Sequence, residues 1–224
     1  FLGGSYAVWA DALVRAGFAV LIFDKRGTGE SQGTYDKDNN ASPQVLELHG
    51  RDLAAAADAL ASDARIDVTR ISFVGLSQAG WTVPAALRHT NNIASFVLIS
   101  GPTCTWREES VFSDATGESA GADWTARRAT ADAAVAKAGP GGFDPLPYLR
   151  LSDVRGHWVF GSRDASIPVT RSKALLDELI AAGRPYSYDV LDEADHLQIS
   201  WRGGVPDFDP RMWVVLQREL NKRR

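Results

Sequence analysis

The chain has 224 residues, of which 45% are hydrophobic and 23% charged, a balance typical of one globular domain with a sizeable core. Its formal net charge of −4 argues against a nucleic-acid-binding protein, no apolar run is long enough to span a membrane, and a single cysteine excludes an intrachain disulfide. No Cys and His spacing typical of a metal site is present. We therefore expect a soluble protein, for which a cytoplasmic location is favoured and whose oligomeric state the sequence does not indicate.

The first elements that the sequence predicts are a helix and a strand. Apolar residues recur at helical spacing from Tyr6 to Ala16, and Gly17 stands where glycine commonly ends a helix. Residues 18–23 are all apolar, which predicts a strand buried on both faces. The chain opens on Phe1, with neither an initiator methionine nor a leader of charged and then apolar residues, so we expect it to be the interior of a longer protein.

A loop with two glycines follows this strand and reads Asp24-Lys25-Arg26-Gly27-Thr28-Gly29-Glu30-Ser31. Two glycines after a strand also occur in dinucleotide sites, but that pattern needs a third glycine at position 32 and a helix directly after it. Position 32 is Gln32, and residues 33–40 form a polar stretch typical of a loop. The dinucleotide interpretation is therefore disfavoured.

One serine in the middle of the chain stands in a distinctive setting. A short apolar strand begins at Ile71 and runs into Gly75-Leu76-Ser77-Gln78-Ala79-Gly80. This segment approximates the G-x-S-x-G turn between a strand and a helix, which exposes a nucleophilic serine above a sheet. Ala79 replaces the second glycine of the pattern, and the alternative interpretation is a turn whose glycines serve packing alone. Ser77 is the candidate nucleophile.

The remaining elements alternate between strands and helices. Strands are predicted over residues 95–100, 157–161 and 186–191, and helices over about 43–62, 78–89, 170–182 and 210–221. This alternation predicts a parallel sheet with right-handed connections and helices on both faces. Residues 102–151 interrupt the alternation with scattered aromatic side chains, and an insertion of this size is usually functional. The alternative is a surface insertion whose aromatic residues pack only on themselves.

Three polar residues follow predicted strands, at the edge where parallel sheets place their sites. Ser77 follows the strand that begins at Ile71, Asp164 the strand at 157–161, and His196 the strand at 186–191. Acyl transfer by a serine needs a base for its proton and a carboxylate that orients the base. Other candidate acids remain in the same region, namely Asp153, Asp189, Asp192 and Asp195. The other histidines fall within or beside regular elements and are interpreted as structural or surface residues, namely His49, His89 and His157.

The chain resembles the α/β-hydrolase superfamily over nearly its whole length, most closely in the D-x-R-G-x-G-x-S loop at 24–31 and in the Ser-Gln-Ala-Gly-Trp segment that starts at Ser77. It looks most like bacterial esterases and hydrolases related to acylaminoacyl peptidases and monoglyceride lipases. The resemblance implies one α/β-hydrolase domain over residues 1–224, with a cap at 102–151 and with N-terminal strands of the fold missing from this chain. In this superfamily the triad follows the order serine, acid, histidine.

The resemblance also implies the roles of single residues. Gly161-x-x-Asp164 is similar to the acid loop of the superfamily and Ala194-Asp195-His196 to its histidine loop, so Ser77, Asp164 and His196 would form the catalytic triad. Asp24 and Arg26 would fix a loop near the site. The backbone N–H of Gln78, at a helix N-terminus, would donate to the oxyanion. A second donor would come from the loop of which Phe1 to Gly4 is the remainder.

These expectations describe a cofactor-free serine hydrolase whose partner is a small-molecule acyl substrate. A carboxylic ester of modest size is the first choice, followed by thioesters and peptides, because subfamilies share these motifs and differ in the cap. Two alternatives use the same residues or the same fold. One is an acyltransferase or perhydrolase with the same triad, and the other is a catalytically weak binding protein with the hydrolase fold.

Overall fold

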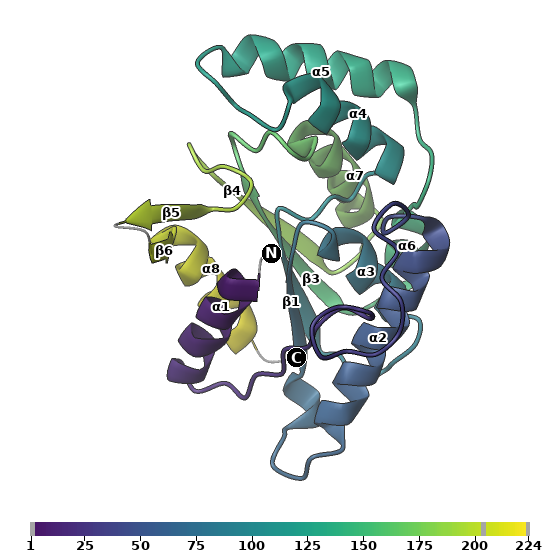
Figure 1. The fold of residues 1–224 in the computed structure, drawn as a ribbon, viewed down its shortest axis with the longest axis vertical. Helices are drawn as coiled ribbons and strands as arrows, with labels where there is room; N and C mark the ends of the chain where they lie inside the picture. The colour runs from purple at the N-terminus through teal and green to yellow at the C-terminus, as the bar shows by residue number, and fades with distance from the viewer. Residues whose placement is uncertain (1–2, 203–204, 223–224) are drawn as a thin grey trace.

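The computed structural model describes residues 3–202 and 205–222, and its centre is a parallel sheet of four strands (Figure 1). The strands are β1 (Ser72–Leu76), β2 (Ser95–Ile99), β3 (Arg155–Gly161) and β4 (Tyr186–Leu191), and they neighbour one another in chain order. Leu76 lies opposite Ile99, which lies opposite Val159, and Gly161 lies opposite Leu191. The carboxyl ends of all four strands therefore share one edge of the sheet.

Helices cover both faces of this sheet, as the sequence predicts. Helices α1 (Gly3–Arg15) and α8 (Pro210–Asn221) lie on one side, and α2 (Pro43–Ala61), α3 (Ala79–Ala86), α6 (Leu146–Leu151) and α7 (Val169–Ala181) lie on the other (Figure 1). A 3₁₀ turn, η1 (Val68–Arg70), precedes β1. The α/β-hydrolase fold predicted from the sequence is confirmed.

The strands are apolar on both faces because each face meets a layer of helices. In β2, Phe96 and Leu98 pack toward α2, α3, α6 and α7, whereas Val97 and Ile99 pack toward α1 and α8. All five residues of β2 are buried. Successive side chains of a strand point to opposite faces, so an uninterrupted apolar run is what a central strand between two helical layers requires.

The predicted strand at residues 18–23 is wrong. These residues have no regular secondary structure, and the side chains of Leu21, Ile22 and Phe23 are 38%, 58% and 46% exposed. A strand needs a neighbour for its backbone N–H and C=O groups. Within the described residues, β1 is the edge strand of the sheet and pairs with β2 alone. Residues 18–23 therefore have no neighbouring strand with which to pair. Apolar composition by itself therefore does not produce a strand here.

Two further differences concern element boundaries and a short strand pair. Helix α3 ends at Ala86, whereas the sequence analysis extended it to about His89. The strands β5 (Ile199–Arg202) and β6 (Val205–Phe208) form an antiparallel pair that the sequence analysis did not predict. The sequence carries Gly203-Gly204 between these strands, and a glycine pair between two short runs is a recognised hairpin signal.

The insertion between β2 and β3 consists of three helices, α4 (Trp106–Thr116), α5 (Trp124–Ala138) and α6. Its aromatic residues do not pack only on themselves. Phe112 and Trp124 meet edge to face at 6.5 Å and share a cluster with Ala165 of the loop after β3. Phe143 packs against Leu46 of α2. The insertion therefore contacts both the strand-end loops and the body of the domain. No helix in the described ranges is long and apolar enough to cross a membrane.

Candidate active site

Ser77 lies at a sharp turn between β1 and α3. Its backbone adopts a positive φ of 53°, which is strained for a residue with a side chain, and its N–H donates to the carbonyl of Ile99 at 2.9 Å. A Cβ on Gly75 would lie 2.3 Å from the Cβ of Ala79, so the first glycine of the motif leaves the space that Ala79 fills. A Cβ on Gly80 would lie 2.4 Å from the carbonyl oxygen of Pro102. The glycines at positions 75 and 80 thus permit a turn this tight, and Ala79 fits within it.

His196 and Asp164 form a hydrogen-bonded pair at the carboxyl edge of the sheet. Nδ1 of His196 lies 3.1 Å from Oδ1 and 3.0 Å from Oδ2 of Asp164. Asp164 is 1% exposed, and its Oδ1 also accepts the backbone N–H groups of Ser166 and Ile167 at 2.9 and 3.0 Å. The carboxylate is therefore fixed by its own loop and oriented toward the imidazole, which leaves Nε2 of His196 available for a further partner.

The pKa of His196 is raised above the ordinary value for histidine. Burial alone would lower this pKa, because the charged imidazolium is poorly solvated, but the hydrogen bond to Asp164 and the charge of Asp164 together outweigh burial. The carboxylates of Glu109 and Asp195 raise it further. The pair thus stabilises a proton on His196, as a general base needs once it has accepted one.

Backbone contacts between the two loops hold this pair in place. The N–H of Arg163 donates to the carbonyl of Ala194 at 2.9 Å, and a Cβ on Gly161 would lie only 2.3 Å from that same carbonyl oxygen. Asp195 accepts the N–H groups of Leu197 and Gln198 through Oδ1 at 3.1 and 2.9 Å. The acid loop and the histidine loop therefore touch through their backbones, and Asp195 shapes the histidine loop.

The other candidate acids are engaged elsewhere. Asp153 pairs with Arg184 at 2.8 Å, Asp189 with Arg218 at 2.6 Å, and Asp192 accepts the hydroxyl of Ser162 at 3.2 Å. The remaining histidines have structural surroundings, as the sequence analysis predicted: His157 is buried with its Nδ1 2.8 Å from Ser187 Oγ, and His89 pairs with Glu47 at 2.7 Å. His49 is 7% exposed, and burial lowers its pKa.

The structure brings Asp164 and His196 together, and it does not join Ser77 to them. Ser77 follows β1 at the same sheet edge, but within the described residues no hydrogen bond links its Oγ to the imidazole of His196. Hydrogen bonds of catalytic groups are often long before substrate binds. The three-residue relay therefore stays a prediction, of which the acid and histidine contact is observed.

Gln78 presents its backbone N–H at the start of α3. Among the residues that the structure describes, no acceptor takes this N–H, and α3 begins directly after it. Its side chain is held on both sides, since Lys25 Nζ donates to Oε1 at 2.6 Å and Nε2 donates to the carbonyl of Asn40 at 3.1 Å. A free N–H at a helix N-terminus favours negative charge. Of the predicted second donor segment, Phe1 and Leu2 lie outside the described residues, and Gly3 and Gly4 belong to α1.

The loop before α2 has the structural contacts expected of it. The carboxylate of Asp24 accepts the N–H of Glu30 at 3.1 Å, and a side chain at Gly29 would overlap that carboxylate. Arg26 binds Asp52 of α2 through two hydrogen bonds of 2.8 and 2.5 Å. These contacts fix the loop that carries Lys25, and through Lys25 they reach Gln78.

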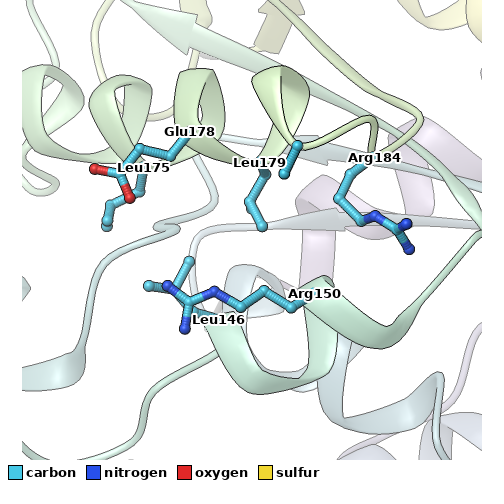
Figure 2. A pocket seen from close by; sticks show the side chains of 7 residues that line it. Leu146, Arg150, Leu175, Glu178, Leu179 and Arg184 are labelled. Carbon is cyan, nitrogen blue, oxygen red and sulfur yellow. The ribbon is translucent and has the colours of Figure 1, made fainter.

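A pocket of about 360 Å³ is lined by residues of α6, of α7 and of the turn after α7. Figure 2 shows its lining from close by. Its lining is apolar at Leu146, Leu175 and Leu179, and Arg150 and Arg184 extend along its rim. None of the predicted site residues lines it. The described residues also contain no group of three or more His, Cys, Asp or Glu side chains arranged to hold a metal ion.

The sequence analysis missed one acidic residue near the site. Glu109 lies on α4, and its charge interacts with those of His196 and Asp164. Burial raises the pKa of Glu109 to about 7, an effect that the nearby carboxylates reinforce and His196 opposes. The segment Thr105-Trp106-Arg107-Glu108 fits a capping-box pattern, which fixes where α4 begins and therefore which face Glu109 occupies. Nothing in the sequence places that face beside His196.

Comparisons with known proteins identify the family of the chain and similar folds. Residues 5–221 match the Prolyl oligopeptidase family (Peptidase_S9). An esterase of Pyrococcus furiosus superposes with a TM-score of 0.63 at 19% identity, over 93% of this chain and 71% of the esterase. Dipeptidyl peptidase 4 of Porphyromonas gingivalis gives a TM-score of 0.57 at 18% identity, over 83% of this chain and 24% of that one.

A puromycin-hydrolyzing peptidase of Mycobacterium tuberculosis gives a TM-score of 0.54 at 19% identity, over 81% of this chain and 26% of the peptidase. The chain thus spans about a quarter of the length of these two peptidases. No curated protein matches it in a sequence search. At these identities the structural likenesses concern the fold.

Proposed function

The chain belongs to the prolyl oligopeptidase family, and we propose that it is a serine hydrolase that cleaves a carboxylic ester through an acyl-enzyme intermediate. The observation that carries this proposal is the pair formed by His196 and the buried carboxylate of Asp164, at the sheet edge where Ser77 follows β1. A buried carboxylate that binds Nδ1 of a histidine fixes the tautomer in which Nε2 can accept a proton.

In the proposed mechanism, Oγ of Ser77 attacks the carbonyl carbon of the ester while Nε2 of His196 takes the hydroxyl proton. Asp164 holds the imidazole through Nδ1–H and stabilises the imidazolium that forms. The backbone N–H of Gln78 donates to the oxyanion. The imidazolium then gives its proton to the leaving alcohol. A water molecule, deprotonated in turn by His196, releases the acyl group as a carboxylic acid, and the imidazolium returns its proton to Oγ of Ser77.

An ester is the proposed substrate, and thioesters and peptides are the next candidates. The matched solved structures include an esterase and peptidases, and the esterase matches over 71% of its length, whereas the peptidases match over about a quarter. Residues 102–151, which contact the acid loop through α4 and α5, are proposed as the cap that selects the acyl group. The whole of residues 1–224 would then be one hydrolase domain.

A fluorophosphonate probe tests this proposal directly, because it reacts with an activated serine whatever the natural substrate is. We expect the chain to be labelled at Ser77 and to hydrolyse p-nitrophenyl butanoate, and we expect Ser77→Ala to lose both activities. Ser110→Ala is the matched control, since Ser110 is a serine of α4 outside the proposed triad. A folded chain that is not labelled would be a binding protein with the hydrolase fold.

A further inference from the structure

The face of α4 that carries Glu109 is turned toward the acid loop. Glu109, Phe112 and Thr116 are spaced by three and four residues, so they lie along one stripe of the helix. Phe112 packs with Ala165, and the hydroxyl of Thr116 donates to the carbonyl of Ala165 at 2.5 Å. The stripe therefore faces the residue next to Asp164, and Glu109 is its N-terminal member.

Three hydrogen bonds join α4, α5 and the segment between them to the acid loop. Besides the bond from Thr116, the indole N–H of Trp124 donates to the carbonyl of Ser162 at 3.0 Å. The guanidinium of Arg163 donates to the carbonyl of Gly121 at 2.8 Å. Because these bonds join both α4 and α5 to the loop that holds Asp164, the face of α4 that carries Glu109 is held toward that loop.

Glu109 differs sharply from its neighbour Glu108. Both carboxylate oxygens of Glu108 have hydrogen-bond partners. Oε2 accepts the N–H and the hydroxyl of Thr105 at 2.8 Å each, and Oε1 accepts the Nε–H of Arg171 at 2.8 Å. The side chain of Glu109, although half-buried, has no hydrogen bond or ion pair within the described part of the chain. A carboxylate that has lost solvent without gaining a partner is destabilised, and burial accordingly raises its pKa to about 7.

We propose that Glu109 determines substrate specificity by binding an ammonium group that lies close to the scissile bond of the substrate. This inference rests on the proposed hydrolase function, because it assigns Glu109 to the same site as His196 and Asp164. A cationic group would supply the partner that the carboxylate lacks, and a hydrogen bond between charged groups is worth roughly tenfold or more in binding. An uncharged substrate would gain nothing from Glu109.

A pair of matched esters measures this preference. The p-nitrophenyl esters of β-alanine and of butanoate have acyl chains of equal length that end in an ammonium and a methyl group. Above the pKa of Glu109, we expect the ratio of kcat/KM for the cationic ester to that for the neutral ester to fall roughly tenfold or more in Glu109→Gln. Glu109→Asp should keep most of the preference. Glu109→Lys should reverse it in favour of p-nitrophenyl succinate, which carries a carboxylate.

Asp114→Asn is the matched control, because it removes the same charge from the same helix. Asp114 is exposed and lies roughly 140° around α4 from Glu109, so it does not face the acid loop. Its charge helps to raise the pKa of Glu109, so the control is compared above that pKa, where Glu109 is ionised in both chains. In Asp114→Asn, the ratio of kcat/KM for the cationic ester to that for the neutral ester should stay within about twofold of the ratio in the parent chain. An unchanged ratio in Glu109→Gln, or an equal fall in Asp114→Asn, would overturn the inference.

The two proposals fail in different ways. If Ser77→Ala abolishes hydrolysis of the butanoate ester but Glu109→Gln leaves the ratio unchanged, only the role of Glu109 is lost. If Ser77 is not needed for hydrolysis or labelling, the hydrolase proposal fails and takes the role of Glu109 with it. Where turnover is slow, the same ratio can be measured as the rate at which Ser77 reacts with aminoalkyl and alkyl fluorophosphonates of equal chain length.

Discussion

Two borders of the proposed site are held in very different ways. One border consists of the loops after β3 and β4, and the other is residues 18–31. The acid and histidine loops are joined to each other, to the sheet and to α4 and α5 by backbone and buried side-chain hydrogen bonds. Residues 18–23 pair with no described strand, and three of their apolar side chains are exposed. The proton-accepting half of the proposed site is therefore preorganised by the fold, whereas its other border is fixed mainly by polar contacts of the 24–31 loop.

This difference indicates which contacts would control the proposed catalysis. The serine turn itself is rigid, because Gly75 and Gly80 leave no room for side chains, and Gln78 is held by Lys25. Residues 18–23, which lead into the 24–31 loop, pair with no strand among the described residues. Variants on the two borders should therefore behave differently. Those of the acid and histidine loops should affect catalysis, and those of the exposed residues 21–23 should affect very little.

The largest expected effect comes from breaking the acid and histidine pair. Asp164→Asn keeps the shape of the side chain but can present N–H to Nδ1 of His196, which favours the wrong tautomer, so we expect kcat to fall by about 10⁴-fold. Hydrolysis of p-nitrophenyl butanoate measures the loss, and far-UV circular dichroism checks that the chain is folded. Asp192→Asn is the control, because Asp192 lies nearby, and among the described residues its carboxylate accepts the hydroxyl of Ser162 while its carbonyl accepts Arg211. A similar loss in both variants would contradict the assignment of Asp164.

The pH dependence of hydrolysis tests the acid and histidine pair as well, with a smaller effect. Below the pKa of His196, kcat/KM should fall roughly tenfold for each pH unit. That pKa is raised in the folded chain, and the base must be neutral, so kcat/KM should rise with pH around a midpoint above 6.5. The stability of the fold should change with pH in the opposite direction. The contribution of the pair is complete below about pH 6.5, the unfolded value, and is lost as pH rises through the folded pKa.

Urea unfolding of Ser77→Ala across this window separates the two effects, since that variant keeps the pair but cannot turn over substrate. In Asp164→Asn the principal cause of the raised pKa is absent, so the loss of stability with rising pH should be smaller. A kinetic midpoint below 6.5 would show that the charge of Asp164 does not outweigh the burial of His196.

Much of the fold follows from the sequence because local pattern and tertiary setting agree there. The apolar run 95–100 lies between two helical layers, and Ser42 caps α2 with Pro43 in its first turn, so the predicted elements are observed. Residues 18–23 have the same apolar composition, but a strand is defined by its neighbour, which composition does not encode. The acid and histidine pair followed from topology and resemblance. Glu109 did not, because only the docking of α4 on the acid loop brings it beside His196.

The smallest expected effect tests the other border of the site. Ile22 is 58% exposed, so Ile22→Ala should change the free energy of unfolding by no more than about 0.5 kcal/mol. Ile99 is 0% exposed at the end of β2, and Ile99→Ala is the matched change, expected to cost about 2–5 kcal/mol because it leaves a cavity between the sheet and α8. Urea denaturation measures both. A cost near 2 kcal/mol at Ile22 would mean that residues 18–23 pack as an interior element in solution, because truncation of an exposed side chain removes almost no buried surface.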